Sequence, residues 1–330
     1  PCSRRQGSDG ARSAVRVAAI MSLPGSAVVP LVARPAVLVE AFANGPCCGN
    51  GAAVVHLDQP MGDVALQAIA RSLNQSETAF LLQQQGRWTL RWFTPSCEVP
   101  LCGHATLAAL LALGHWQQLA LGQGLELVTR SGPLAVALDA SGSSGQLVLP
   151  SAGLLPTEPA PALIRLLHKR LGASPLAYWS SGLGYRVALL TPEVALAQLP
   201  GLAAELEGPD RAGLVLMQAI ETGSINDRPC VLGRPADYQL RFFAPGLGID
   251  EDPVTGSAHA LVAPFWLDRL GRSSVVGWQC SPRPGGMVCE SSSSGMIRLS
   301  GSGHLLWNGT LWVQADGSGA ESWASLVACA

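Results

Sequence analysis

The sequence predicts an α+β protein of two pseudo-symmetric domains, each a curled, mainly antiparallel, barrel-like sheet around a central apolar helix. The first observation is a repeat at an offset of 150 residues, in which Arg91-Trp92-Phe93-Thr94-Pro95 and Cys102-Gly103-His104-Ala105 correspond to Arg241-Phe242-Phe243-Ala244-Pro245 and Thr255-Gly256-Ser257-Ala258-His259. The second is that the expected strands and helices follow a similar order in both halves. A repeat of this length is too long for a solenoid and indicates two related halves that face each other.

The first half is expected to begin with strand, turn, strand, helix and strand. Short apolar runs bounded by turn residues predict strands at residues 35–42, 52–57, 77–82 and 88–94. Residues 61–73 have apolar side chains at helical spacing, and residues 105–113 are an apolar run without a polar face. A helix that is apolar all round is a buried one, so we place residues 105–113 at the centre of the domain.

The second half repeats this order. We expect helices at residues 160–171, 192–206 and 258–270, and strands at residues 184–190, 214–220 and 238–243. Short strands at residues 288–289, 295–299 and 311–313, separated by Gly and Ser, then close the chain as a meander.

These elements divide the chain into four parts. Residues 1–35 are expected to be a disordered or irregular N-terminal extension, residues 36–145 the first domain, residues 146–310 the second domain, and residues 311–330 a C-terminal strand and tail that could return to the first domain. The first 35 residues carry five arginines against a single acidic residue, Asp9, and lack clear periodicity. A tail or start-site artefact ahead of Met21, a targeting peptide and a functional arm stay open as interpretations of this segment.

Composition excludes several classes of function. The 330 residues have a formal net charge of −2 and no basic run, so we expect neither nucleic acid nor a membrane as a partner. The only lysine, Lys169, is expected on a solvated helix face, which disfavours a Schiff-base cofactor. Nine cysteines at irregular spacing, without a CxxC pair, together with scattered histidines, predict reduced thiols, a cytoplasmic location and no metal.

The repeated glycines suggest what the two halves bind. A glycine before a helix lets the backbone approach a ligand, and the free N–H groups of the first turn carry partial positive charge. Two such helix starts, at Gly103 and Gly256, could face each other and hold an anion such as a carboxylate.

Three motifs together identify a family. The motifs are Gly248-Ile249-Asp250-Glu251-Asp252-Pro253-Val254-Thr255-Gly256-Ser257-Ala258-His259, Leu101-Cys102-Gly103-His104-Ala105-Thr106 and Asn74-Gln75-Ser76-Glu77-Thr78-Ala79-Phe80. Together they resemble the phenazine biosynthesis isomerase (PhzF-like) family, whose fold is that of diaminopimelate epimerase. The resemblance runs from about residue 37 to about residue 313 and includes residues 279–286.

The resemblance implies two similar domains with an active site in the cleft, a homodimer, no cofactor and a small carboxylate-bearing substrate. It implies that Glu77 is the acid/base, and that His104, Asp252 and Ser257 are the polar residues around the substrate. We take Glu77, His104 and Asp252 as catalytic, and Asn50, Gly103, Gly256 and Ser257 as substrate-binding.

The repeat also bears on the mechanism. A diaminopimelate-type epimerase uses two thiols, one at each helix start, and the matching residues here are Cys102 and Thr255. A threonine hydroxyl has no accessible acid dissociation near neutral pH, so a two-thiol racemase is disfavoured. An epimerase that uses Cys102 with another partner, and a non-catalytic binder of small molecules, stay open. Cys48-Gly49-Asn50-Gly51-Ala52 spells the epimerase thiol motif almost to the letter, but it follows the first strand, and we interpret it as a turn.

Overall fold

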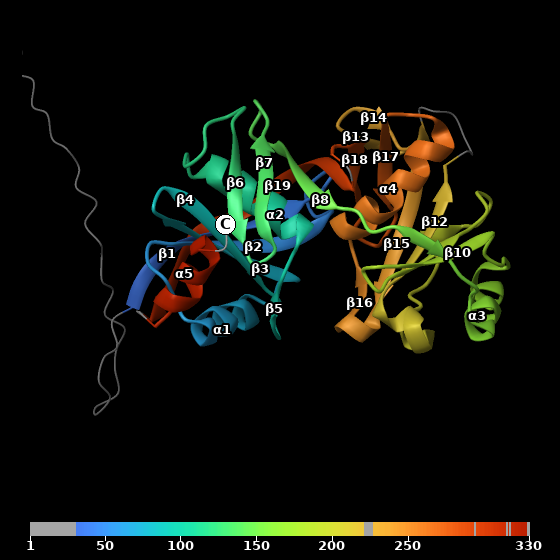
Figure 1. Cartoon of the computed structure of the whole chain (residues 1–330), viewed down its shortest axis with the longest axis horizontal. Helices are drawn as coiled ribbons and strands as arrows, with labels where there is room; N and C mark the ends of the chain where they lie inside the picture. The colour runs from blue at the N-terminus through green and yellow to red at the C-terminus, as the bar shows by residue number, and fades with distance from the viewer. Residues whose placement is uncertain (1–30, 221–226, 294, 315, 317, 329–330) are drawn as a thin grey trace, which may run out of the picture.

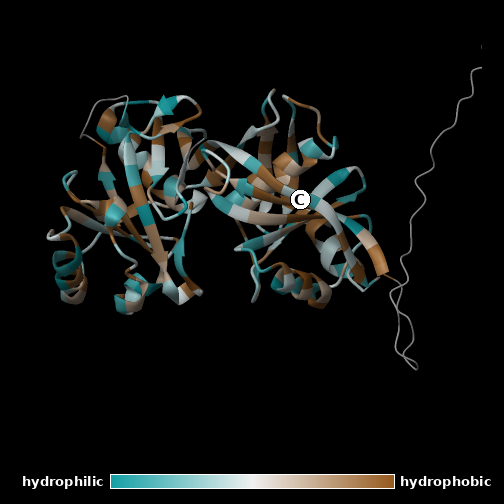
Figure 2. Cartoon of the chain, turned by 180° about the vertical axis from the view of Figure 1, so that it is seen from behind, coloured by the Kyte–Doolittle hydropathy of each residue, from teal (hydrophilic) through white to brown (hydrophobic). Residues whose placement is uncertain are grey.

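The computed structural model describes residues 31–220, 227–293, 295–314, 316 and 318–328, and it has two halves that lie side by side (Figure 1). Each half is a curled sheet, and α2 (Gly103–His115) and α4 (Gly256–Leu270) are the long central helices of the first and second halves. Hydrophobic segments run through the interior of both halves (Figure 2). The expected α+β class and the two related halves are therefore confirmed.

Strand pairing in the first half closes a barrel. The ring runs β1–β2–β3–β4–β6–β7–β8–β19 and returns to β1, with β2–β3 and β4–β6 parallel and the other pairs antiparallel. The bounds of these strands are β1 Leu31–Ala41, β2 Asn50–Leu57, β3 Glu77–Gln84, β4 Arg87–Phe93, β6 Gly124–Thr129, β7 Gly132–Leu138, β8 Ser144–Pro150 and β19 Met296–Gln314, and the short β5 is Glu98–Val99.

The second half repeats the pairing. Its order is β9–β10–β11–β12–β15–β17–β18–β19, and the parallel pairs β11–β12 and β15–β17 occupy the places of β2–β3 and β4–β6. The bounds are β9 Leu154–Pro156, β10 Ala177–Ser181, β11 Arg186–Leu189, β12 Leu214–Ala219, β15 Tyr238–Ala244, β16 Ile249–Asp252, β17 Ser274–Gln279 and β18 Gly285–Ser291, with β13 Cys230–Val231 and β14 Arg234–Pro235 as a separate hairpin.

The helices differ in burial as their sequences predict. Residues 103–113 of α2 are all buried, which agrees with its lack of a polar face. By contrast α1 (Asp63–Leu73) and α3 (Pro161–Leu171) bury one face only. The C-terminal α5 (Ala320–Ala328) packs on the first half, where Trp323 Nε1 donates a hydrogen bond of 2.9 Å to the carbonyl of Met61. Among the described residues, no helix is long and apolar enough to cross a membrane.

The arginine shared by the two repeats, Arg91 and Arg241, has a structural role. Arg91 donates to both oxygens of Glu98, at 2.8 and 2.7 Å, and its guanidinium lies 5.1 Å from the centre of the Phe93 ring. Arg241 makes the same pair of bonds with Glu251 in the second half. A buried guanidinium needs such a bidentate carboxylate, so the Arg-x-Phe part of the repeat fixes β4 to β5 and β15 to β16.

Three expectations from the sequence are wrong. Residues 192–206 form no α-helix; they hold the short 3-10 turns Leu196–Gln198 and Ala203–Glu205, because Pro200-Gly201 interrupts the apolar periodicity. The separate strands expected at 295–299 and 311–313 belong to one strand, β19, which pairs with β18 and β8 and then crosses to β1. Residues 31–35, expected to be irregular, belong to β1.

Two further expectations concern the ends of the chain. Residues 1–30 of the expected extension lie outside the described residues. The tail expected after residue 313 contains α5, and the limits of the two domains stay predictions.

Candidate active site

The two helix starts face each other at the junction of the halves. A side chain added at Gly103 would bring its Cβ to 3.5 Å from the Cα of Gly256 and to 3.1 Å from a methyl group of Leu149, and one at Gly256 would lie 3.5 Å from the Cα of Gly103. The residues before them, Cys102 and Thr255, are extended N-cap residues without a side-chain cap bond. The first-turn N–H groups of both helices are therefore directed toward one region.

Glu77 and His104 meet beside these helix starts. Glu77 is the first residue of β3 and His104 lies in the first turn of α2; they are 8% and 4% exposed. His104 Nε2 lies 2.9 Å from Glu77 Oε2, although this oxygen has no hydrogen-bond partner of good geometry among the described residues. Cys102 Sγ lies 3.4 Å from the other ring nitrogen of His104. A carboxylate, an imidazole and a thiol thus form one buried cluster.

The charges of this cluster depend on one another. Burial opposes a charged imidazole, but the Cys102 sulfur and the Glu77 carboxylate outweigh it and raise the pKa of His104 well above its ordinary value. Burial, followed by the negative charge of Glu77, raises the pKa of the Cys102 thiol. Cys102 and Glu77 are therefore the two neighbours that favour a charged imidazole at His104.

Asn50 connects the cluster to the second half. Its side-chain nitrogen donates to Asp252 Oδ1 at 2.6 Å and to the carbonyl of Val254 at 3.1 Å, and it lies 3.2 Å from His104 Nδ1. Ser76 Oγ donates to Asn50 Oδ1 at 3.1 Å. Asn50 begins β2 in the first half, whereas Asp252 ends β16 in the second. The hydrogen bond between Asn50 and Asp252 therefore links the two halves at the site.

Asp252 is buried with few compensating charges. Thr255 Oγ1 donates to its Oδ2 at 2.5 Å, which leaves both carboxylate oxygens hydrogen-bonded. Burial raises the pKa of Asp252 to about 6; Glu77 adds to the rise, and His104, Thr255 and Asn50 oppose it. A carboxyl group with this pKa changes its protonation state close to neutral pH.

The fold brings together Asn50, Glu77, His104, Asp252, Gly103 and Gly256, six of the seven residues that we selected from the sequence. The seventh, Ser257, follows Gly256 in α4, and its hydroxyl lies 3.4 Å from Tyr185 Oη. Cys48 lies in the turn before β2, as expected, and Gly49 in this turn has a φ of +71°, which favours glycine. The roles assigned to these residues stay predictions.

Two residues of the site were given no role in the sequence analysis. Tyr185 lies just before β11 and packs against Phe242 at 4.8 Å between ring centres. Burial raises its pKa; the hydrogen bond with Ser257 opposes this rise, and Asp252, Cys102 and Glu77 add to it. Gln279, at the end of β17, accepts from the Thr255 backbone N–H at 2.8 Å and donates to the Asp252 carbonyl at 2.6 Å. Gln279 lies in the segment 279–286 that the family resemblance includes, but no role was assigned to it there; Tyr185 lies outside the repeat and the motifs.

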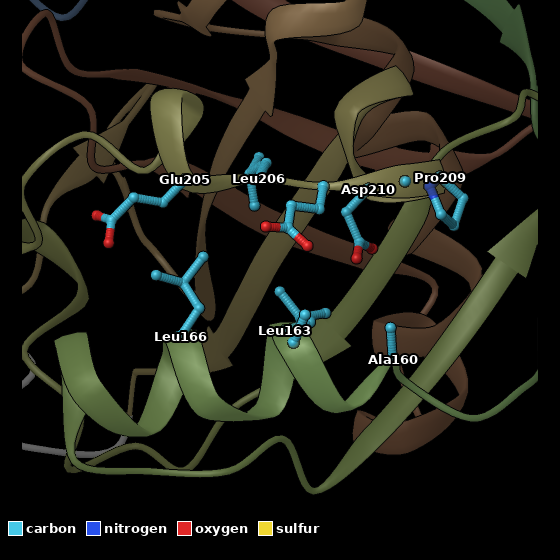
Figure 3. A pocket seen from close by; sticks show the side chains of 10 residues that line it. Ala160, Leu163, Leu166, Glu205, Leu206, Pro209 and Asp210 are labelled. Atoms are coloured by element: carbon cyan, nitrogen blue, oxygen red, sulfur yellow. The ribbon is translucent and has the colours of Figure 1, made fainter.

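A separate pocket of about 170 Å³ lies far from these groups in the fold. Leu163 and Leu166 on α3 form one wall, and Glu205, Leu206 and Asp210 form the opposite wall (Figure 3). None of the residues that line it belongs to the cluster around Glu77. The convergence of polar groups, rather than this pocket, marks the candidate active site.

Comparison with known proteins agrees with the fold and the motifs. Residues 39–306 match the model of the phenazine biosynthesis-like (PhzC-PhzF) protein family. A Pseudomonas aeruginosa protein with the name uncharacterized isomerase is 37% identical over 268 residues, which cover 81% of this chain and 94% of that protein. The crystal structure of an Enterococcus faecalis protein of the PhzF family has a TM-score of 0.73 and 29% identity, with coverage of 86% of this chain and 100% of that one.

A more distant structure extends the likeness in fold alone. The hydroxyproline epimerase of Agrobacterium vitis has a TM-score of 0.55 at 12% identity and covers 88% of this chain and 98% of that one. The fold is thus of the diaminopimelate epimerase-like class. The chain belongs to the phenazine biosynthesis-like family.

Proposed function

We propose that the protein is a cofactor-independent isomerase that moves a proton between carbon atoms of a small carboxylate-bearing metabolite, with Glu77 as the single acid/base. The observation that carries the proposal is the buried contact of 2.9 Å between Glu77 and His104 at the point where the two helix starts meet. The name of the Pseudomonas aeruginosa relative supports an isomerase in general.

Glu77 is placed to act as both base and acid. Its Oε2 lies 2.9 Å from His104 Nε2, so we assign the acceptance of a proton from a substrate carbon to the other carboxylate oxygen. His104 stabilises the carboxylate while the proton is absent and orients it. When the proton returns to a second carbon on the same face, Glu77 is regenerated and no other proton carrier is consumed.

The helix starts would hold the charge that develops on the substrate. Removal of a proton next to a carboxylate or carbonyl places negative charge on oxygen. The first-turn N–H groups after Gly103 and Gly256, with the Ser257 hydroxyl, are donors suited to that oxygen or to the substrate carboxylate. Asp252, held by Asn50 and Thr255, would orient the substrate from the second half. We also propose a homodimer, on the family resemblance alone.

Solvent deuterium tests this function. The protein would be incubated in D₂O with a panel of small unsaturated mono- and dicarboxylates, and deuterium would be followed by mass spectrometry and NMR. We expect exchange at carbon and a shifted double bond without stereoinversion. Inversion would favour the epimerase that uses Cys102, and no exchange across the panel would favour the non-catalytic binder.

Glu77→Gln is the decisive variant once a substrate is known. General acid–base catalysis contributes about 100- to 10,000-fold to rate, so we expect kcat to fall by that order. Glu126→Gln is the matched control, because Glu126 is an exposed glutamate on β6. Unchanged turnover in Glu77→Gln would remove Glu77 from its role, whereas an equal loss in Glu126→Gln would point to an effect on folding.

A further inference from the structure

Three side chains of different chemistry, one of them the candidate acid/base, lie close together at the site. Glu77, Cys102 and His104 each offer a ligand atom, and these atoms all lie within 4.8 Å of one another. They come from two places in the fold, the start of β3 and the start of α2. Neither the CxxC spacing nor the histidine spacing that marks a zinc site in sequence is present, so only the fold reveals the cluster.

One ring nitrogen of His104 lies close to the ligand atoms of both Glu77 and Cys102. His104 Nε2 lies 2.9 Å from Glu77 Oε2 and 3.9 Å from Cys102 Sγ. A tetrahedral zinc ion with bonds of about 2.0–2.3 Å places its ligand atoms roughly 3–4 Å apart. Small adjustments of Glu77 and Cys102 would therefore admit an ion with three protein ligands and one open position.

We propose that Glu77, Cys102 and His104 bind a thiophilic divalent cation, Zn²⁺ above all, and that the bound ion inhibits the isomerase. Thiolate, imidazole and carboxylate are the ligand set that zinc prefers, whereas Mg²⁺ and Ca²⁺ prefer oxygen ligands alone. The Oε2 of Glu77, which has no well-directed hydrogen bond among the described residues, lies on a side chain that is 10% exposed and supplies a buried carboxylate oxygen for the ion.

Binding exchanges protons for the metal. Zn²⁺ displaces the thiol proton of Cys102 and the proton that His104 carries on the ligating nitrogen, and both protons go to solvent. The affinity should therefore rise with pH. The inhibition rests on the proposed function, because an ion on Glu77 removes the carboxylate that would take the substrate proton.

Binding itself can be measured without any substrate. The reduced full-length protein would be titrated with ZnCl₂ by calorimetry and in competition with a chromophoric chelator. We expect one tight site, weakened at least about 10-fold in Cys102→Ser and in Glu77→Gln. The double variant Cys47→Ser/Cys48→Ser is the matched control, because Cys47 is exposed and Cys48 is only partly buried, and neither belongs to the cluster. Its affinity should equal that of the wild type.

A spectroscopic measurement on the wild type tests the metal site without depending on whether the variants fold. Co²⁺ in the same site should give strong visible bands of a tetrahedral ion and a thiolate charge-transfer band. The proposal is overturned if the folded wild type binds no stoichiometric Zn²⁺, if the Co²⁺ complex lacks the thiolate band, or if binding survives in Cys102→Ser and is lost in the control. If the metal-free protein isomerises nothing and still binds Zn²⁺ tightly, the proposed function is refuted and the metal site stands.

Discussion

Replacement of Asp252 by Asn is expected to stabilise the protein at neutral pH while it impairs the site. Asp252 is 8% exposed, and its pKa is raised to about 6 from an ordinary value of 3.8. One pKa unit corresponds to about 1.4 kcal/mol, so a shift of this size makes the ionised carboxylate cost the fold about 3 kcal/mol at pH 7.

The sign of the pH dependence follows from proton binding. Between the unfolded and folded pKa values, from about 3.8 to about 6, the folded state holds a proton that the unfolded state has lost. Stability therefore falls as pH rises through this window and stays lower above it. Asp252→Asn removes the titration, so the gain in free energy of unfolding should be near zero below pH 4 and up to about 3 kcal/mol at pH 7.

Hydrogen bonding sets how much of this gain is realised. An amide oxygen can accept from Asn50 as Asp252 Oδ1 does, but an amide nitrogen would face the Thr255 hydroxyl, which now donates to Oδ2 at 2.5 Å. The hydroxyl must turn and accept instead, at a cost of about 1 kcal/mol.

Urea unfolding from pH 4 to pH 8 measures the effect. Asp250→Asn, an exposed aspartate on the same strand β16, is the control and should change little at any pH. A variant Asp252→Asn that is equally destabilised at pH 4 and pH 7 would refute the reasoning, because it would show that hydrogen bonds, and not desolvation of the charge, dominate at this position.

Two further predictions concern other residues. Tyr185→Phe keeps the packing on Phe242 but removes the hydroxyl that lies 3.4 Å from the Ser257 hydroxyl. The KM for a carboxylate substrate should therefore rise about 3- to 10-fold, while kcat and the melting temperature stay nearly unchanged. A large fall in kcat alone would contradict this role. Arg241→Met leaves the partly buried Glu251 without its partner and should cost about 3 kcal/mol in urea unfolding. Most of this cost should be regained in the double variant with Glu251→Leu, and a double variant no more stable than the single one would refute the pairing.

Burial of the central helices was predictable because it depends on local sequence. A run without a polar face, such as residues 105–113, can only be stable inside, and α2 is buried along that run. Strand β19 could not be predicted as one element, because the local sequence Gly301-Ser302-Gly303 predicts a turn that would end the strand. Pairing with β8 and β1 on either side of these residues overrides that local signal.

The residues of the site could be predicted where they belong to a recognisable sequence motif. Glu77, His104 and Asp252 were chosen through the family resemblance, and the fold brings them to one place although 175 residues separate Glu77 from Asp252. Tyr185 lies in a connection before β11 whose path depends on the barrel around it. No local pattern fixes such a path, so its place beside Ser257 needed the structure.

The two halves supply equivalent helix starts but unequal chemistry. Thr255, the counterpart of Cys102, donates a hydrogen bond of 2.5 Å from its hydroxyl to Asp252, and its backbone N–H donates to Gln279. The hydroxyl therefore holds a carboxylate in place. On the other side, Cys102 is kept as a thiol by burial beside Glu77. A two-thiol mechanism of stereoinversion needs a thiol at each helix start, and here Cys102 has only Thr255 as its counterpart. The backbone N–H groups remain alike in both halves, so both helix starts can contribute to anion binding, whereas the proton transfer that we propose is assigned to Glu77 in the first half.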